Sequence, residues 1–115
     1  MSSITDDYMC EVIKTRKPYT LVVFRGGPKA KEPGADKVIW EHGRRNLELR
    51  KAGTVNLIIG LRDEWEIEGL DVFNRDVDET RRIMQEDPAV KAGVLTYEIH
   101  PVVSFPGDFL SGARR

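Results

Sequence analysis

The sequence predicts one α+β domain, in which an antiparallel sheet of four strands carries two helices on one face. Two observations lead to this fold class. Segments with strand-like and helix-like patterns follow one another along the 115 residues in the order β-α-β-β-α-β. The first of these strands is apolar on both sides, whereas a strand that faces water on one side alternates, so the second sheet face also needs a cover.

Residues 1–18 form an N-terminal extension ahead of the predicted domain. Its apolar side chains recur at helical spacing, at Tyr8, Met9, Val12 and Ile13. This spacing favours a short amphipathic helix that Pro18 would end. The alternative is a loosely docked leader, which is common at chain termini. The segment is acidic up to Glu11 and has no long apolar run, which argues against a secretory signal.

The first strand is predicted at residues 19–25, which are apolar and β-branched and run into the turn formers of residues 26–28. The first helix is predicted at residues 36–52, where helix formers are frequent and proline is absent. We expect Asp36 to cap the start of this helix and Gly53 to follow its end.

The second strand is predicted at residues 54–61, because its apolar residues alternate and should share one face: Val55, Leu57, Ile59 and Leu61. A weaker third strand follows at residues 67–73. The Asp76-x-x-Glu79 pattern then predicts the start of a short second helix. We expect this helix to run to Glu86, before Asp87 and Pro88 close it.

The fourth strand is predicted at residues 94–105, with one apolar face made of Leu95, Tyr97, Ile99, Val103 and Phe105. Residues 106–115 are expected to be an irregular tail. The order of elements over residues 19–105 is that of the ferredoxin-like split βαβ fold (βαββαβ). A second copy of the chain is the simplest cover for the open sheet face, so we expect a homodimer through that face.

Composition excludes several classes of function. The chain has 18 basic and 19 acidic residues, so it lacks the net positive charge that holds nucleic acid. The third strand is acidic and has one aromatic residue, unlike an RNA-binding sheet. No apolar run approaches the length of a membrane span, so we expect a cytoplasmic protein. A single cysteine excludes an internal disulfide and a cysteine-rich zinc site.

His42 and Asp87 are the main candidates for chemistry. One stripe of the first helix carries Val38, His42, Arg45, Leu49 and Ala52, which places His42 at the boundary with the sheet. Asp87 ends the second helix beside apolar positions. Since both helices lie on one sheet face, the two side chains can meet, and a His–Asp pair is a usual general base. The alternatives are a histidine bonded to a carbonyl group and an aspartate that serves a helix-stop turn.

Arg25 and His100 are weaker candidates. The glycine amides after Arg25 suit an anionic ligand, although the loop matches neither a P-loop nor a dinucleotide motif and is also explained as a turn. His100 lies opposite the apolar stripe of the fourth strand, so it faces the dimer cavity or solvent. Because this places His100 and His42 on opposite sides of the sheet, we expect no metal site.

Three stretches of the chain carry a family resemblance. They are residues 21–28, the helix that places His42 eleven residues before Gly53, and residues 86–94 followed by 97–101. On these motifs the sequence resembles the YciI-like (YCII-related) family of the dimeric α+β barrel superfamily. The resemblance implies back-to-back dimers and an active site in which the family's histidine falls on His42 and its aspartate on Asp87. Residues 1–18 and Gly43, directly after the histidine, depart from the family pattern.

Three hypotheses about function follow. The first is a cofactor-independent enzyme in which His42 and Asp87 perform acid–base chemistry on a cyclic or aromatic small molecule, as a lyase, isomerase or dehalogenase. Arg25, Tyr97 and His100 are then the candidate substrate-binding residues. The second is a dimer that binds a small ligand without chemistry or assists a larger enzyme. The third is a haem-degrading or quinol-oxidising relative, which would need an axial ligand in an apolar pocket.

Overall fold

A computed structural model of the protein describes residues 2–112; the first residue of the N-terminal extension and residues 113–115 of the tail lie outside the described residues. The helices and strands are α1 (Asp6–Ile13), β1 (Lys17–Gly26), α2 (Ala35–Lys51), β2 (Val55–Gly60), β3 (Ile67–Phe73), α3 (Val77–Gln85), α4 (Pro88–Lys91) and β4 (Leu95–Ser104). Within the described residues, the strands form one antiparallel sheet in the order β2-β3-β1-β4. The predicted α+β class with an antiparallel sheet is confirmed.

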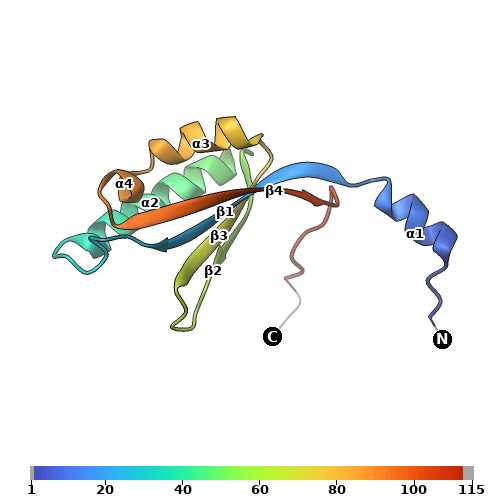
Figure 1. The fold of residues 1–115 in the computed structure, drawn as a ribbon, viewed down its shortest axis with the longest axis horizontal. Helices are drawn as coiled ribbons and strands as arrows, with labels where there is room; N and C mark the ends of the chain where they lie inside the picture. Colours follow the sequence, from blue (N-terminus) through green and yellow to red (C-terminus); the bar gives the residue numbers. More distant parts are fainter. Residues whose placement is uncertain (1, 113–115) are drawn as a thin grey trace.

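The helices that follow β1 lie on one face of the sheet (Figure 1). α2 lies against β2, and α3 lies against β4, with α4 between α2 and β4. In the part of the chain that the structure describes, the other sheet face carries no helix. α1 stands apart at the far end of the molecule and none of its eight residues is buried.

The core lies between the sheet and α2, α3 and α4. Its largest fully buried apolar side chains are Val22, Val55, Phe73 and Met84. Burial of each such side chain contributes about 1.5–3 kcal/mol to folding. Val23, on the opposite face of β1, is also only 7% exposed, so both sides of this central strand are apolar and largely covered.

The start of α2 differs from the expectation. The N-cap is Gly34, whose φ of 89° lies in the left-handed region, and it makes no side-chain cap. A glycine adopts this conformation without steric cost, so the chain turns into the helix two residues before the expected cap. Asp36 is instead an acidic residue in the first turn, where its charge favours the helix dipole. Gly53, at φ 82°, follows the helix as predicted.

The second strand does not keep its apolar residues on one face. Val55 is opposite Phe73, but Leu57 is opposite Val72, because the register shifts between Val55 and Leu57. A bulge of this kind reverses the alternation of the side chains that follow it. Val55 and Ile58 therefore pack on the helix side, and the expectation of one shared face for Val55, Leu57, Ile59 and Leu61 is wrong.

The second predicted helix is two helices. Asp76 caps α3 as predicted, since its carboxylate accepts a hydrogen bond from the Glu79 amide at 2.8 Å. Asp87 does more than close this helix, because it is also the N-cap of α4, which the sequence analysis missed. Pro88 stands at the first position of α4, where its missing N–H is not needed.

The ends of β1 and β4 extend beyond the rest of the sheet. β1 pairs with β4 from Lys17 onward but with β3 only from Thr20 onward. Pro18 lies in this extension rather than at the end of a helix, and its missing N–H is tolerated where one side of the strand is unpaired. Val103 lies opposite Pro18 in this extension and is 58% exposed.

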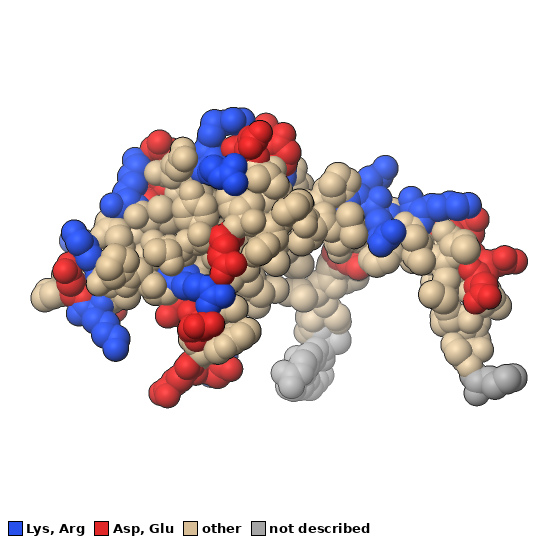
Figure 2. All heavy atoms as spheres, viewed as in Figure 1, with Lys and Arg blue, Asp and Glu red and all other residues tan. Residues whose placement is uncertain are grey.

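The surface carries both signs of charge. On the face drawn in Figure 2, basic and acidic side chains of the described residues are interspersed, in line with their nearly equal numbers. Within residues 2–112, no helix has the length and apolar character needed to cross a membrane.

Candidate functional site

His42 lies on the face of α2 that is turned toward the sheet. The ring of Phe24 on β1 meets the imidazole edge to face, with ring centroids 5.0 Å apart. Only 13% of the His42 side chain is exposed. The helical stripe therefore carries this imidazole to the boundary between α2 and the sheet, as the sequence analysis expected.

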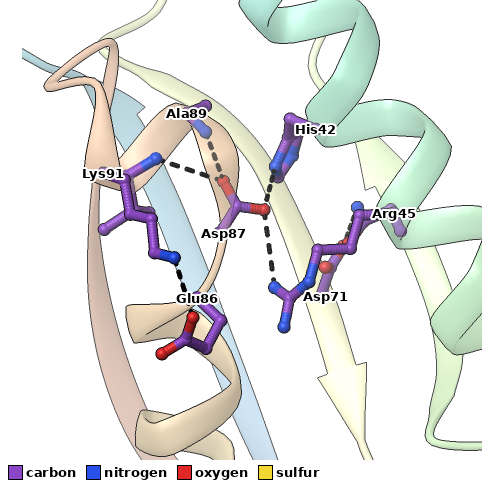
Figure 3. A network of polar contacts seen from close by, with 9 residues as sticks. His42, Arg45, Asp71, Glu86, Asp87, Ala89 and Lys91 are labelled. Carbon is purple, nitrogen blue, oxygen red and sulfur yellow. Dashed lines mark hydrogen bonds and ion pairs between the residues drawn. The ribbon is translucent and has the colours of Figure 1, made fainter.

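Asp87 lies where α3 passes into α4, and its carboxylate serves both the helix and the histidine. One oxygen, Oδ2, accepts hydrogen bonds from the backbone N–H groups of Ala89 and Val90 at 3.0 and 3.2 Å. The other oxygen, Oδ1, lies 2.7 Å from Nδ1 of His42 (Figure 3). The structure thus brings together the two side chains singled out from the sequence, although they are 45 residues apart.

These contacts stabilise the ionised form of the Asp87 carboxyl group. Burial by itself raises the pKa of Asp87, which is 1% exposed. The hydrogen bond and charge of His42 and the two α4 amides outweigh burial, so the pKa lies below its ordinary value. Arg45, one helical turn after the histidine, adds a positive charge 3.8 Å from Oδ1 (Figure 3). Asp87 is therefore ionised at neutral pH, and its Oδ1 accepts a hydrogen bond from the N–H group at Nδ1 of His42.

Asp71 and Asn46 are buried polar residues that the sequence analysis did not select. Asp71 lies on β3 and is 1% exposed, and Asn46 lies on α2 and is 6% exposed. The Asn46 side-chain amide donates a hydrogen bond to Oδ1 of Asp71 at 3.2 Å. A signal was present, because Asp71 alternates with Phe73 on the buried face of β3 and Asn46 follows His42 by one helical turn.

The pKa values of Asp71 and Asp87, the two carboxyl groups that interact with His42, are shifted in opposite directions. Burial raises the pKa of Asp71 to about 6, and the charge of His42 and the hydrogen bond from Asn46 oppose this rise only in part. The Asp87 charge adds to the rise. Carboxyl groups whose pKa values are pushed apart in one site are typical of acid–base assignments in enzymes.

A cavity of about 990 Å³ opens beside these residues, between α2 and the sheet. His42, Asn46 and Asp71 line it together with apolar side chains such as Phe24 and Ile58. Gly43 also lines it, and nothing lies within 4 Å of where a Cβ atom at Gly43 would be. The volume and the mostly apolar lining with a few convergent polar groups are typical of small-molecule sites.

The three predicted substrate-binding residues lie elsewhere. Tyr97 packs against the core from β4, and it is not among the described residues that line the cavity. Arg25 and His100 lie on the open face of the sheet, where both contact Glu98, at 2.7 and 3.0 Å. The hydrogen bond to Glu98 raises the pKa of Arg25, and that to Arg25 lowers the pKa of Glu98. Their role in binding stays a prediction, separate from the cavity of His42.

Metal ligation is not suggested by the side chains that the structure describes. Among them, no group of three or more His, Cys, Asp or Glu residues has the arrangement of a metal site. His42 contacts Phe24 on the helix side of the sheet, whereas His100 lies opposite Leu21 on the other face.

No protein-family model matches this chain, and no curated protein is a significant match to it. The resemblance to the YciI-like family therefore stays a prediction from the motifs, and the site has to be interpreted from its own geometry.

Proposed function

We propose that the protein is a cofactor-independent enzyme in which His42 is the general base and Asp87 orients it. The observation that carries this proposal is the 2.7 Å contact between Nδ1 of His42 and the buried carboxylate of Asp87, at the edge of a mostly apolar cavity. An ionised acceptor at Nδ1 keeps the proton on that nitrogen, so Nε2 of the neutral ring holds the free lone pair. Nε2 can then take a proton from a bound substrate.

The substrate is proposed to be a small cyclic or aromatic molecule with an acidified C–H bond. When Nε2 removes this proton, the electron pair of the C–H bond stays on the substrate and the imidazole becomes positive. Asp87 stabilises the imidazolium through its charge, and general-base catalysis of this kind contributes about 10²–10⁴-fold to a rate. Return of the proton at another carbon gives an isomerase, and departure of a neighbouring group gives a lyase or dehalogenase.

The proposal is tested by hydrogen exchange, which needs no knowledge of the natural substrate. Cyclohexanone and γ-butyrolactone are incubated with the protein in D₂O, and loss of the C–H signal next to the carbonyl is followed by ¹H NMR. We expect wild type to exceed buffer, and His42→Gln to lose most of the excess. Lys37→Gln is the matched control, because Lys37 is exposed on the same helix and does not line the cavity.

Two outcomes would argue against a catalytic base. Exchange equal to that of buffer in wild type, or unchanged exchange in His42→Gln, would refute the proposal. Should a probe bind in the cavity without exchange, the alternative function of a non-catalytic ligand-binding protein would replace it.

We also propose that the chain has the ferredoxin-like fold of the dimeric α+β barrels and forms a homodimer through its open sheet face. The order β2-β3-β1-β4 and the apolar residues on both sides of β1 support this. Sedimentation analysis should give twice the chain mass of 13.1 kDa. Leu21→Glu, at a half-buried position on the open face, should give a folded monomer, and a wild-type protein that sediments as a monomer would refute the dimer.

A further inference from the structure

Two buried polar atoms on the cavity wall have no hydrogen-bond partner among the described residues. They are Oδ2 of Asp71 and Oδ1 of Asn46. Both residues are more than nine-tenths buried and both line the cavity. An unsatisfied buried polar group costs about 1–3 kcal/mol, so a folded protein rarely keeps two neighbouring ones without a use for them.

The two atoms differ in what they offer a ligand. Oδ1 of Asn46 can only accept a hydrogen bond, because its amide nitrogen is the group that donates to Asp71. Oδ2 of Asp71 donates a hydrogen bond when the carboxyl is protonated and accepts one when it is ionised. When Asp71 is protonated, a ligand group that fits both atoms must therefore donate and accept at one point, and a hydroxyl is the smallest group that does so.

We propose that Asn46 and Asp71 form a polar subsite that binds a hydroxyl group on an otherwise apolar, uncharged ligand. The hydroxyl donates to Oδ1 of Asn46 and accepts from Oδ2 of Asp71. The apolar side chains of Phe24 and Ile58 then contact the hydrocarbon part of the ligand. This inference rests on the proposed function, because both place the ligand in the same cavity, and it adds the class of group that the substrate carries.

The charged surroundings of Asp71 favour an uncharged ligand. His42 from α2 and Asp87 from the start of α4 act on Asp71 with opposite signs. The other charged residues that line the cavity come from α2 and β3: Asp36, Arg44, Glu48, Lys51 and Glu68. All five are exposed, so water screens them, and the two signs nearly balance. None of these groups supplies a buried cation for a carboxylate ligand beside Asp71.

The test compares probes that differ only in hydrogen bonding. Cyclohexanol, methoxycyclohexane and cyclohexanecarboxylate are titrated at pH 5 into the ¹⁵N-labelled full-length protein, and dissociation constants are taken from saturable amide shifts. We expect cyclohexanol to bind about tenfold more tightly than the methyl ether, because the ether cannot donate to Asn46; one hydrogen bond to a buried acceptor is worth about this factor. The carboxylate should bind most weakly.

Two variants separate the subsite from general packing. In Asn46→Leu/Asp71→Leu both partners become apolar groups of similar size, a change that is close to neutral for folding. The tenfold preference for the alcohol should vanish or reverse in this variant. Asp71→Asn keeps the shape and still offers a donor, so it should keep most of the preference even if the double variant fails to fold.

The inference is overturned if none of the probes binds, if alcohol and ether bind equally to wild type, or if the preference survives in the double variant. It is also overturned if the shifted amides lie on the open face of the sheet. The exchange assay with His42→Gln reports separately on the base. A hydroxyl preference without exchange would therefore refute the proposed catalysis alone, and exchange without the preference would refute the subsite alone.

Discussion

Replacement of Asp71 by asparagine should change how the stability of the protein depends on pH. Asp71 is buried on β3, and burial raises its pKa from an ordinary 3.8 to about 6. The folded state therefore binds the proton more tightly than the unfolded state. The stabilising effect of this protonated carboxyl is complete below pH 3.8 and is lost as the pH rises through about 6.

The size of this effect follows from the two pKa values. Each factor of ten in proton affinity corresponds to about 1.4 kcal/mol. The gap between 3.8 and about 6 corresponds to about 3 kcal/mol in all. Because the carboxyl is already partly ionised in the unfolded chain at pH 4, Asp71 lowers the free energy of unfolding by about 2 kcal/mol between pH 4 and pH 7. Asp71→Asn has no proton to lose, and its amide can still pair with Asn46. The stability of the variant relative to wild type should rise by about 2 kcal/mol over this range.

The assay is urea unfolding at fixed protein concentration and at several pH values from 4 to 8. Far-UV circular dichroism is the suitable signal, because Trp40 and Trp65 are 70% and 56% exposed and would report poorly on the core. Fixed concentration matters because dimerisation would add to apparent stability. The difference between variant and wild type cancels the titration of groups that the substitution leaves unchanged.

The contribution of Asp87 to stability changes with pH in the opposite direction, so the two contributions can be told apart. Its pKa in the folded protein lies below the ordinary value, so its stabilising effect is present above that value and is lost on acidification. A flat difference between Asp71→Asn and wild type from pH 4 to pH 7, or one that falls with pH, would refute the assignment of a buried, destabilised carboxylate at Asp71.

Three further predictions concern folding. Asp87→Ala should lower the free energy of unfolding by about 3 kcal/mol at pH 7, since it removes the partner of His42 and the α4 cap. Urea unfolding at pH 3 should show a smaller loss, and an equal loss at pH 3 and pH 7 would contradict the role of the Asp87 charge. Gly27→Ala should lower the melting temperature, because its Cβ atom would collide with a backbone carbonyl. Gly43→Ala lies in open space on α2 and should stabilise the protein by about 1 kcal/mol. A higher melting temperature for Gly27→Ala than for Gly43→Ala would refute the close backbone contact at Gly27. Met84→Ala, at a fully buried position, should cost about 2–5 kcal/mol in urea unfolding, and a loss below 1 kcal/mol would place Met84 outside the core.

Local sequence patterns were sufficient to predict features that depend on a single helix or strand. The third strand has the predicted bounds of Ile67–Phe73, because alternation within a strand needs no knowledge of its neighbours. The cap at Asp76 was likewise predicted, since its partner lies three residues away. His42 was placed correctly at the boundary of helix and sheet, because helical periodicity alone decides which face of α2 it occupies.

Local sequence patterns did not predict features that depend on contacts with a second segment of the chain. The bulge in β2 depends on how Val55 and Leu57 pair with β3, and the alternation within β2 gives no sign of it. Asp71 was passed over because its strand looked acidic as a whole, whereas its position beside Phe73 on the buried face is what matters. The exposure of Val103 likewise depends on how far β1 and β4 extend beyond the rest of the sheet, which the pattern within β4 does not show.

The sequence alone determined the α+β class, the four strands and the helix face on which His42 lies, because these depend on periodicities of a few residues. Only the tertiary structure decided that Asp87 caps a separate helix, that Asn46 meets Asp71, and that a cavity opens beside them. The physical reason is that burial, and with it the pKa of each carboxyl, arises from side chains that packing brings together from distant parts of the chain.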